Sequence, residues 1–264
     1  GSADKTVLVQ SIQPVWTLVA QLGADEKDPS KVGGSPISNR ALCLDFSPDG
    51  KLLAVGGGDP SRSGEITIWD AATGKLVKKL GDAHSDTVLG IRFSRSGKSL
   101  LTGAADKFVK IFDVASGNFV KSFEGHTHHV LDVAWKADES TIVSSGADNV
   151  IKVWNIETGE QKRTISGYSK QVTSIAFLGL GDNIVSGGGD KTVRMHLTTN
   201  GSNYRNLSGS TDYVYSVAGS RDESIVIAGG EDGILRVWDA KTGKLLNSFN
   251  PPPVPQNQQA SAGK

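Results

Sequence analysis

Apolar and polar residues alternate along most of the chain in short runs, separated by polar segments rich in glycine and aspartate. One unit shows the pattern clearly, with alternating or β-branched runs at residues 130–135, 141–144 and 150–155, a weaker run at 161–165, and a polar turn at 136–140. Alternation with a period of two residues is typical of strands that bury one face, whereas a helix needs apolar spacing near 3.6 residues. The unit therefore predicts four short strands joined by tight turns.

The four-strand unit recurs along the chain with a nearly constant step. Five dipeptides follow one another at intervals of 43, 42, 42 and 42 residues, namely Trp69-Asp70, Phe112-Asp113, Trp154-Asn155, His196-Leu197 and Trp238-Asp239. A glycine follows each dipeptide at the next turn, where a positive φ is expected. Because one small sheet cannot bury both of its faces alone, the units are expected to stack on one another in a radial array.

Gly125-His126 and Trp154-Asn155, at this period, form a pattern that resembles the signature of the WD40 family. The resemblance extends over residues 4–250 and implies an all-β fold, a WD40-type β-propeller. It places five full four-stranded blades at about residues 40–84, 87–126, 130–168, 172–210 and 214–250.

A narrower likeness concerns residues 36–249, which are most similar to WD40 regions that follow a cytochrome c-type domain in large exported proteins of planctomycete-like bacteria. Three phrases carry it, Ser61-Arg62-Ser63-Gly64-Glu65, Asp82-Ala83-His84-Ser85-Asp86-Thr87-Val88 and Glu124-Gly125-His126-Thr127-His128-His129-Val130. This likeness implies an exported or periplasmic bacterial protein. The residues themselves leave the compartment undetermined, because one cysteine, Cys43, can form no intrachain disulfide.

Residues 4–22 carry the outer half of a further blade. Asp4–Gln10 aligns with Asp190–His196, which predicts a third strand, and Trp16–Leu22 would be the fourth. Since WD40 rings usually close with seven blades, five and a half repeats indicate a fragment of a larger propeller, or an incomplete ring that a dimer or a distortion closes. Residues 1–3 read as a cloning remnant, and the Pro- and Gln-rich residues 251–264 as a disordered tail.

The resemblance also implies a side-chain network of His, Ser or Thr, Asp and Trp that pins each blade. The third repeat carries the complete set, which is His126, Ser144, Asp148 and Trp154. A Ser, His and Asp set also raises a catalytic interpretation, but the family pattern accounts for every member structurally. We therefore expect a structural tetrad and no catalytic residue.

The other repeats carry parts of this network. The second has His84, Thr102 and Asp106, with Phe112 in place of Trp. The fourth has Tyr168, Ser186, Asp190 and His196, and the fifth has Asp232 and Trp238, with Ser210 and Ala228 in place of His and Ser. The first offers Val55, Asp59 and Trp69.

Composition and spacing exclude several other classes of site. The 28 basic and 28 acidic residues cancel, so no nucleic-acid partner is expected. The apolar stretch at residues 6–22 is interrupted by polar residues and proline, so it predicts no membrane span. His84, His126, His128 and His129 have no obvious acidic or thiol co-ligand, and His128 and His129 are expected to point in different directions, so neither a metal nor a cofactor is predicted. Cys43 is expected in an inner strand as a buried, apolar thiol.

Two departures from the repeat predict a partner surface. Asp59 precedes Trp69 by ten residues, against six in the other repeats, which indicates a four-residue insertion in the loop at residues 60–64. The connection at residues 23–39 is also long. With the two neighbouring histidines, the candidate surface comprises Lys27, Lys31, Arg40, Asp59, Pro60, Ser61, Arg62, His128 and His129. The alternative is that these loops only tolerate length or cap an incomplete ring.

These observations predict a non-catalytic scaffold that binds a protein or peptide. The alternative is a docking or sensing module of a larger exported redox protein of the cytochrome c type. An enzyme is disfavoured, because no acid and base pair, metal set or nucleophile stands outside the repeat pattern. Self-association through open blade edges is a further expectation.

Overall fold

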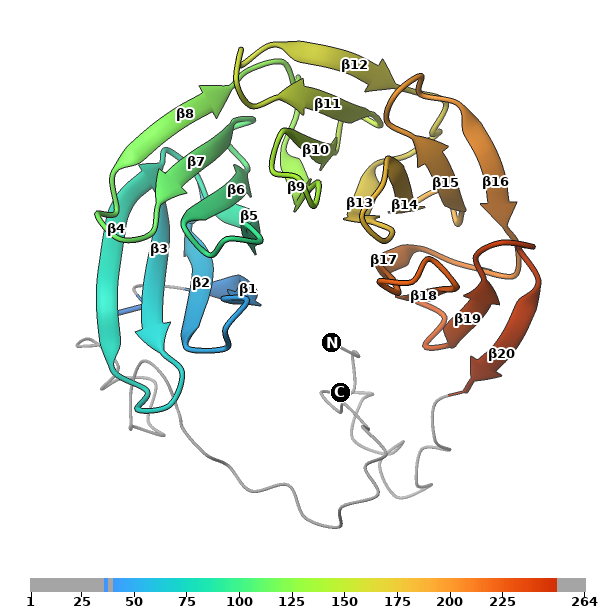
Figure 1. The fold of residues 1–264 in the computed structure, drawn as a ribbon, viewed down its shortest axis with the longest axis horizontal. Helices are drawn as coiled ribbons and strands as arrows, with labels where there is room; N and C mark the ends of the chain where they lie inside the picture. The colour runs from blue at the N-terminus through green and yellow to red at the C-terminus, as the bar shows by residue number, and fades with distance from the viewer. Residues whose placement is uncertain (1–35, 38–39, 251–264) are drawn as a thin grey trace, which may run out of the picture.

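The computed structural model describes residues 36–37 and 40–250 of the 264-residue chain (Figure 1). This part of the chain forms five four-stranded antiparallel sheets and contains no helix. In every sheet the strands pair in the order of the sequence, so each sheet is one repeat. The predicted all-β fold with five four-stranded blades is therefore confirmed. The predicted half blade at residues 4–22 and the predicted tail at 251–264 lie outside the described residues.

The strand bounds of the five blades are as follows. The first blade contains β1 (Ala41–Phe46), β2 (Leu52–Asp59), β3 (Ser63–Asp70) and β4 (Leu76–His84). The second contains β5 (Val88–Phe93), β6 (Ser99–Ala104), β7 (Val109–Asp113) and β8 (Phe119–Phe123). The third contains β9 (Val130–Trp135), β10 (Thr141–Gly146), β11 (Ile151–Asn155) and β12 (Gln161–Ile165). The fourth contains β13 (Val172–Phe177), β14 (Asn183–Gly188), β15 (Val193–Leu197) and β16 (Asn203–Leu207). The fifth contains β17 (Val214–Gly219), β18 (Ile225–Gly230), β19 (Leu235–Asp239) and β20 (Leu245–Phe249).

The blades follow one another around a central opening, and the described residues form an arc (Figure 1). The first strand of each blade lies at the inner edge of the arc, and the fourth strand lies at the outer edge. The described residues leave a gap between the first and the fifth blade. Within them, no helix has the length and apolar character needed to cross a membrane.

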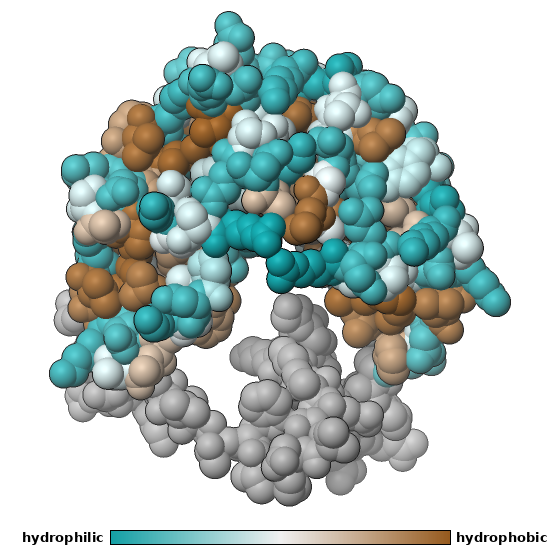
Figure 2. All heavy atoms as spheres, in the orientation of Figure 1, coloured by the Kyte–Doolittle hydropathy of each residue, from teal (hydrophilic) through white to brown (hydrophobic). Residues whose placement is uncertain are grey.

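Equivalent repeat positions form the core between neighbouring blades. At the end of the fourth strand, Phe123, Ile165 and Leu207 expose at most 3% of their surface, whereas Phe249 of the fifth blade exposes 53%. Leu235 of β19 is likewise 42% exposed. The fifth blade therefore presents an apolar face that no described residue covers, visible as a brown patch over β17–β20 (Figure 2). The expected self-association through such faces stays a prediction.

The first blade differs from the others in its central hairpin. Strands β2 and β3 have eight residues each and pair as far as Asp59 and Ser63, with Pro60, Ser61 and Arg62 forming the tip. The expectation of an enlarged loop at residues 60–64 is thus wrong. The inserted residues extend the antiparallel ladder, because paired strands satisfy the backbone N–H and C=O groups that a loop would leave to solvent. Ser61 takes a positive φ of 59°, which closes the short tip.

Two phenylalanines at the same repeat position allow a matched test of this packing. Phe123→Ala should lower the free energy of unfolding by about 3–5 kcal/mol, because Phe123 is buried against Trp154 of the next blade at a ring-centroid distance of 5.7 Å. Phe249→Ala should lower it by less than about 1 kcal/mol, because that ring is half exposed. Urea denaturation of the two variants measures both values. Equal losses would contradict the uncovered face.

Candidate functional site

The third blade holds a complete tetrad of buried polar side chains. His126 precedes β9 and places Nδ1 2.9 Å from Oδ2 of Asp148, while its Nε2 lies 2.8 Å from Oγ of Ser144. Trp154 Nε1 donates to the same hydroxyl oxygen at 2.9 Å. Because an indole N–H can only donate, the Ser144 hydroxyl is free to donate to Nε2, and Nδ1–H then donates to Asp148. The structure thus brings together the four residues of the predicted tetrad.

Burial alone would raise the pKa of Asp148, but hydrogen bonds from His126 and from the Thr127 N–H lower it below its ordinary value. The order Asp148, His126, Ser144 is also that of a catalytic triad. However, Ser144 exposes none of its surface, and its oxygen accepts the indole N–H. A substrate would have to displace the indole to reach that hydroxyl, so the geometry favours a stabilising network over a catalytic triad.

The second blade repeats this arrangement without the indole. His84 Nδ1 lies 2.9 Å from Asp106 Oδ2, and its Nε2 lies 2.8 Å from Thr102 Oγ1. The Phe112 ring occupies the indole position, 6.3 Å from the His84 ring between centroids. Burial lowers the pKa of His84, against the opposing effect of Asp106, so the neutral imidazole is favoured.

The fourth and fifth blades replace the histidine by an arginine from a neighbouring strand. Arg194 Nη2 lies 3.0 Å from Asp190 Oδ2, and Arg236 Nη1 lies 2.8 Å from Asp232 Oδ2. In both repeats the arginine stands four residues after the aspartate, where the second and third repeats have lysine. These two ion pairs were not among the predicted contacts. Their signal was present, because arginine occurs at this position only in the repeats that offer Tyr168 or Ser210 instead of histidine.

His196 occupies the indole position of the fourth blade and is 2% exposed. Tyr168 OH lies 2.6 Å from Ser186 Oγ and 3.5 Å from His196 Nδ1. Burial, reinforced by the charge of Arg194, lowers the pKa of His196 to about 4. In the fifth blade, Trp238 Nε1 donates to the backbone carbonyl of Ser208 at 2.9 Å.

The first blade does not assemble the set expected from Val55, Asp59 and Trp69. Trp69 Nε1 donates instead to Thr67 Oγ1 at 2.8 Å. Asp59 lies at the hairpin tip, with Oδ2 3.2 Å from Arg62 Nη1. The lengthened strands β2 and β3 move it away from the position that the aspartates of the other repeats occupy.

The predicted partner surface is assembled in part. The Ser61 N–H donates to Asp86 Oδ1 at 2.8 Å, which joins the hairpin tip to the connection between β4 and β5. The pKa of Asp86 is below its ordinary value, because hydrogen bonds from Ser61 and Thr87 and the charge of His129 outweigh its burial. The Asp86 carboxylate therefore fixes the position of the hairpin tip.

The two neighbouring histidines lie closer together than expected. The rings of His128 and His129 are 4.4 Å apart between centroids, and the His129 N–H donates to His128 Nδ1 at 2.8 Å. The expectation that these side chains point in different directions is therefore wrong, because this hydrogen bond folds the His128 ring back along the turn. The described residues contain no group of three or more His, Cys, Asp or Glu side chains arranged for a metal ion.

The other positions predicted from the sequence are Arg40, Lys27, Lys31 and Cys43. Arg40 is exposed just before β1, whereas Lys27 and Lys31 lie outside the described residues. Cys43 is half-buried in β1, with Sγ 3.7 Å from the carbonyl of Val88, and burial raises the pKa of its thiol to about 12. A thiol with this pKa is a poor nucleophile near neutral pH.

Comparison with known families decides the origin of this repeat. The family model described as "WD domain, G-beta repeat" matches residues 34–70, 74–113, 117–155, 159–196 and 201–239. The chain belongs to the WD40 family. Each matched segment ends at or next to the repeat dipeptide, so the networks described above are WD40 blade networks.

Among similar WD40 proteins, WD repeat-containing protein 1 of Xenopus tropicalis is 39% identical over 83 residues. Retinoblastoma-binding-like protein E of Dictyostelium discoideum is 37% identical over 89 residues, and U3 small nucleolar RNA-associated protein 12 of Saccharomyces cerevisiae is 37% identical over 73 residues. The alignments cover 31%, 34% and 28% of this chain, but only 13%, 16% and 7% of those proteins. These relatives are eukaryotic and give no support to the narrower bacterial, cytochrome-linked resemblance.

The tetrad of the third blade can be tested by removing its carboxylate. Asp148→Ala should lower the free energy of unfolding by about 1–3 kcal/mol, because the His126 Nδ1–H and the Thr127 N–H lose their acceptor. Glu157→Ala, at an exposed turn of the same blade, is the control. A loss no larger than that of the control, measured by urea denaturation, would contradict a stabilising tetrad.

His196 should make the fold sensitive to mild acid. The unfolded chain takes up a proton at His196 near its ordinary pKa of 6.5, whereas the folded chain resists protonation until about pH 4. The stability is therefore complete above pH 6.5 and falls by about 1 kcal/mol per pH unit between these values. His196→Phe, which introduces the residue of the second blade at this position, should flatten this decline in urea titrations at pH 7 and pH 5. An unchanged decline would rule out His196 as its source.

Proposed function

We propose that this WD40 protein is a non-catalytic scaffold that binds a protein or peptide at the face carrying the hairpin tip of the first blade. WD40 repeats serve in general as protein-interaction scaffolds. The observation that carries the proposal is the lengthened hairpin. Strands β2 and β3 have eight residues each, against six in the second strands and five in the third strands of the other blades. The first blade therefore extends farther at this face than its neighbours.

The hairpin tip has the properties of a preorganised contact. Pro60, Ser61 and Arg62 are exposed, while the Ser61 N–H is held by Asp86 and Arg62 by Asp59. A protrusion held in this way loses little conformational entropy when it binds, which favours affinity. With 28 basic and 28 acidic residues in the chain, a protein partner is favoured over a nucleic acid.

The alternative of a docking or sensing module for an exported redox protein has no contact among the described residues in its favour. The eukaryotic relatives also give it no support. We therefore retain the scaffold as the proposal.

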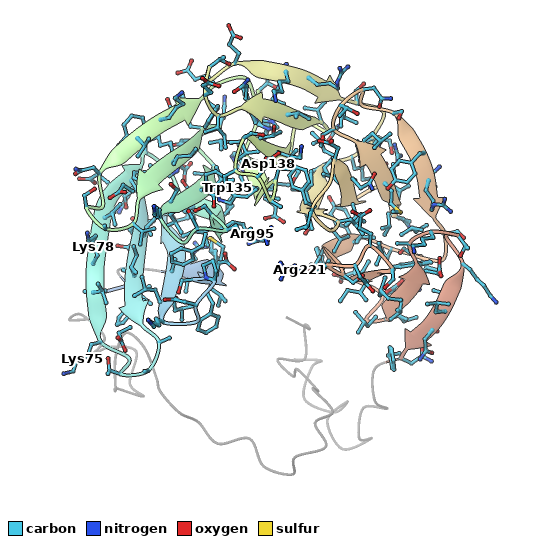
Figure 3. The ribbon with its side chains drawn as sticks, in the orientation of Figure 1. Lys75, Lys78, Arg95, Trp135, Asp138 and Arg221 are labelled. Atoms are coloured by element: carbon cyan, nitrogen blue, oxygen red, sulfur yellow. The ribbon has the colours of Figure 1, made fainter. Side chains whose placement is uncertain are left out.

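Capture experiments with the whole chain test the proposal. A variant lacking residues 60–63, and the point variant Arg62→Glu, should each lose about tenfold of the captured partner, measured by quantitative mass spectrometry. Lys75→Glu is the matched control, because Lys75 is exposed in the turn at the far end of the same β3 strand (Figure 3).

Melting curves should first establish that all variants are folded. The same proteins captured in the same amounts by the intact chain, both hairpin variants and the control would refute binding at the hairpin tip.

A further inference from the structure

A second candidate surface lies on the face opposite to the hairpin tip of the first blade. On this face the inner strands of the middle blades end. A hollow of about 260 Å³ opens there between the ends of β5, β9 and β13. Trp135 and Phe177 line it, together with the small side chains of Ala134 and Ala176. The lining therefore provides an apolar floor large enough for one apolar side chain.

One repeat position explains both the hollow and its surroundings. The second residue after the inner strand is Arg95 in the second blade, Ala137 in the third, Gly179 in the fourth and Arg221 in the fifth. Ala137 and Gly179 both line the hollow, so it exists because this position is small in two adjacent blades. The second and fifth blades, which flank these two blades, carry an arginine at the same position.

The two arginines are available to a ligand. Both are exposed, and within the described part of the chain neither guanidinium makes an ion pair or a hydrogen bond. They reach toward the central opening from different sides of the arc, with Trp135 at its inner edge (Figure 3). Hydrophilic side chains cover this inner edge in the surface view (Figure 2).

The acidic side chains of the same turns are already engaged by neighbours. Glu139 accepts hydrogen bonds from the backbone and hydroxyl of Ser96, and Glu223, which lies over Gly179, accepts one from Asn183 at 2.9 Å. Asp138 and Asp182 both form ion pairs with Lys136, and Asp132 of β9 forms one with Arg92. Asp222 accepts hydrogen bonds from Ser220 and Ser224, and Asp49 accepts one from Ser47. Among the described residues, none of these carboxylates forms an ion pair with Arg95 or Arg221.

We propose that this hollow binds an acidic segment of a protein partner. One aliphatic or aromatic side chain of the partner enters between Trp135 and Phe177, and carboxylates on either side of it pair with Arg95 and Arg221. Such pairing supplies orientation and speed of association, while the buried apolar side chain supplies most of the affinity. The site lies at the end of the blades opposite to the hairpin tip, so it is independent of the proposed function at that tip.

A defined peptide tests the proposal on the full chain. The probe is a fluorescein-labelled peptide with one phenylalanine flanked on both sides by glutamates, and binding is measured by fluorescence anisotropy. Two control peptides replace the glutamates by glutamine or the phenylalanine by serine. The acidic phenylalanine peptide should bind about tenfold more tightly than either control, and its affinity should fall as salt is raised.

Variants separate the two parts of the site. Arg95→Gln combined with Arg221→Gln should weaken binding of the probe about tenfold. Lys107→Gln combined with Lys244→Gln removes the same charge from exposed lysines outside the turns that follow the inner strands, and it should leave binding unchanged. Ala137→Leu should close the hollow and abolish the preference for phenylalanine over serine. The turn accommodates a long side chain, because the equivalent position is arginine in two other blades.

No measurable binding of the probe, equal binding of the glutamine peptide, or an unchanged affinity of the double arginine variant would each overturn the proposal. The variant lacking residues 60–63 should bind the probe as the intact chain does. Failure at the hairpin tip and failure at the hollow can therefore be told apart.

Discussion

Each sheet of this protein has two apolar faces and can bury them only against the sheets on either side. The same strand positions are therefore buried or half-buried at every junction between described blades, and they are exposed where the arc ends, at Phe249. Polar contacts at the inner edge fix how neighbouring sheets are aligned. Asp45 accepts the Phe93 N–H at 2.7 Å, and Asp132 accepts the Ile175 N–H at 3.1 Å, each across one junction. Because these bonds fix the position of each inner strand along its own direction relative to the next strand, they also fix the relative positions of the turns that follow the strands.

A second constraint acts inside each blade, where the carboxylate between the second and third strands needs a donor. In the third blade the donor is the imidazole of His126, and in the fifth it is the guanidinium of Arg236. The two solutions differ in geometry, because the imidazole offers one ring N–H to the carboxylate whereas the guanidinium is a permanent cation with several N–H donors. The repeat therefore tolerates the loss of its histidine so long as another strand supplies a donor for Asp232. An unpaired carboxylate at this position would be costly to bury.

The fold followed from the sequence because strand alternation and the period of 42 to 43 residues are local signals that repeat five times. Contacts between strands were harder to predict. The tetrad pattern concerns the histidine position alone, so it did not predict that Asp190 pairs with Arg194. The spacing of Asp59 from Trp69 revealed an insertion but not that its residues pair, since that depends on the backbone path of β2 and β3. The close approach of the His128 and His129 rings depends on one turn conformation, which residue types alone do not determine.

The hollow at the inner edge illustrates how such a fold can acquire a specific surface without altering its core. Residues in the strands are constrained by burial on both faces, but the second residue after each inner strand is free to vary because it lies in a turn. At this position two small residues, Ala137 and Gly179, leave space, and the aromatic side chains of Trp135 and Phe177 form the walls of that space. A longer side chain at Ala137 would fill the hollow while leaving the junctions between blades intact. The aligned inner strands bring the small residues of adjacent repeats together. Specificity at this site therefore depends on which side chains are small as much as on which are charged.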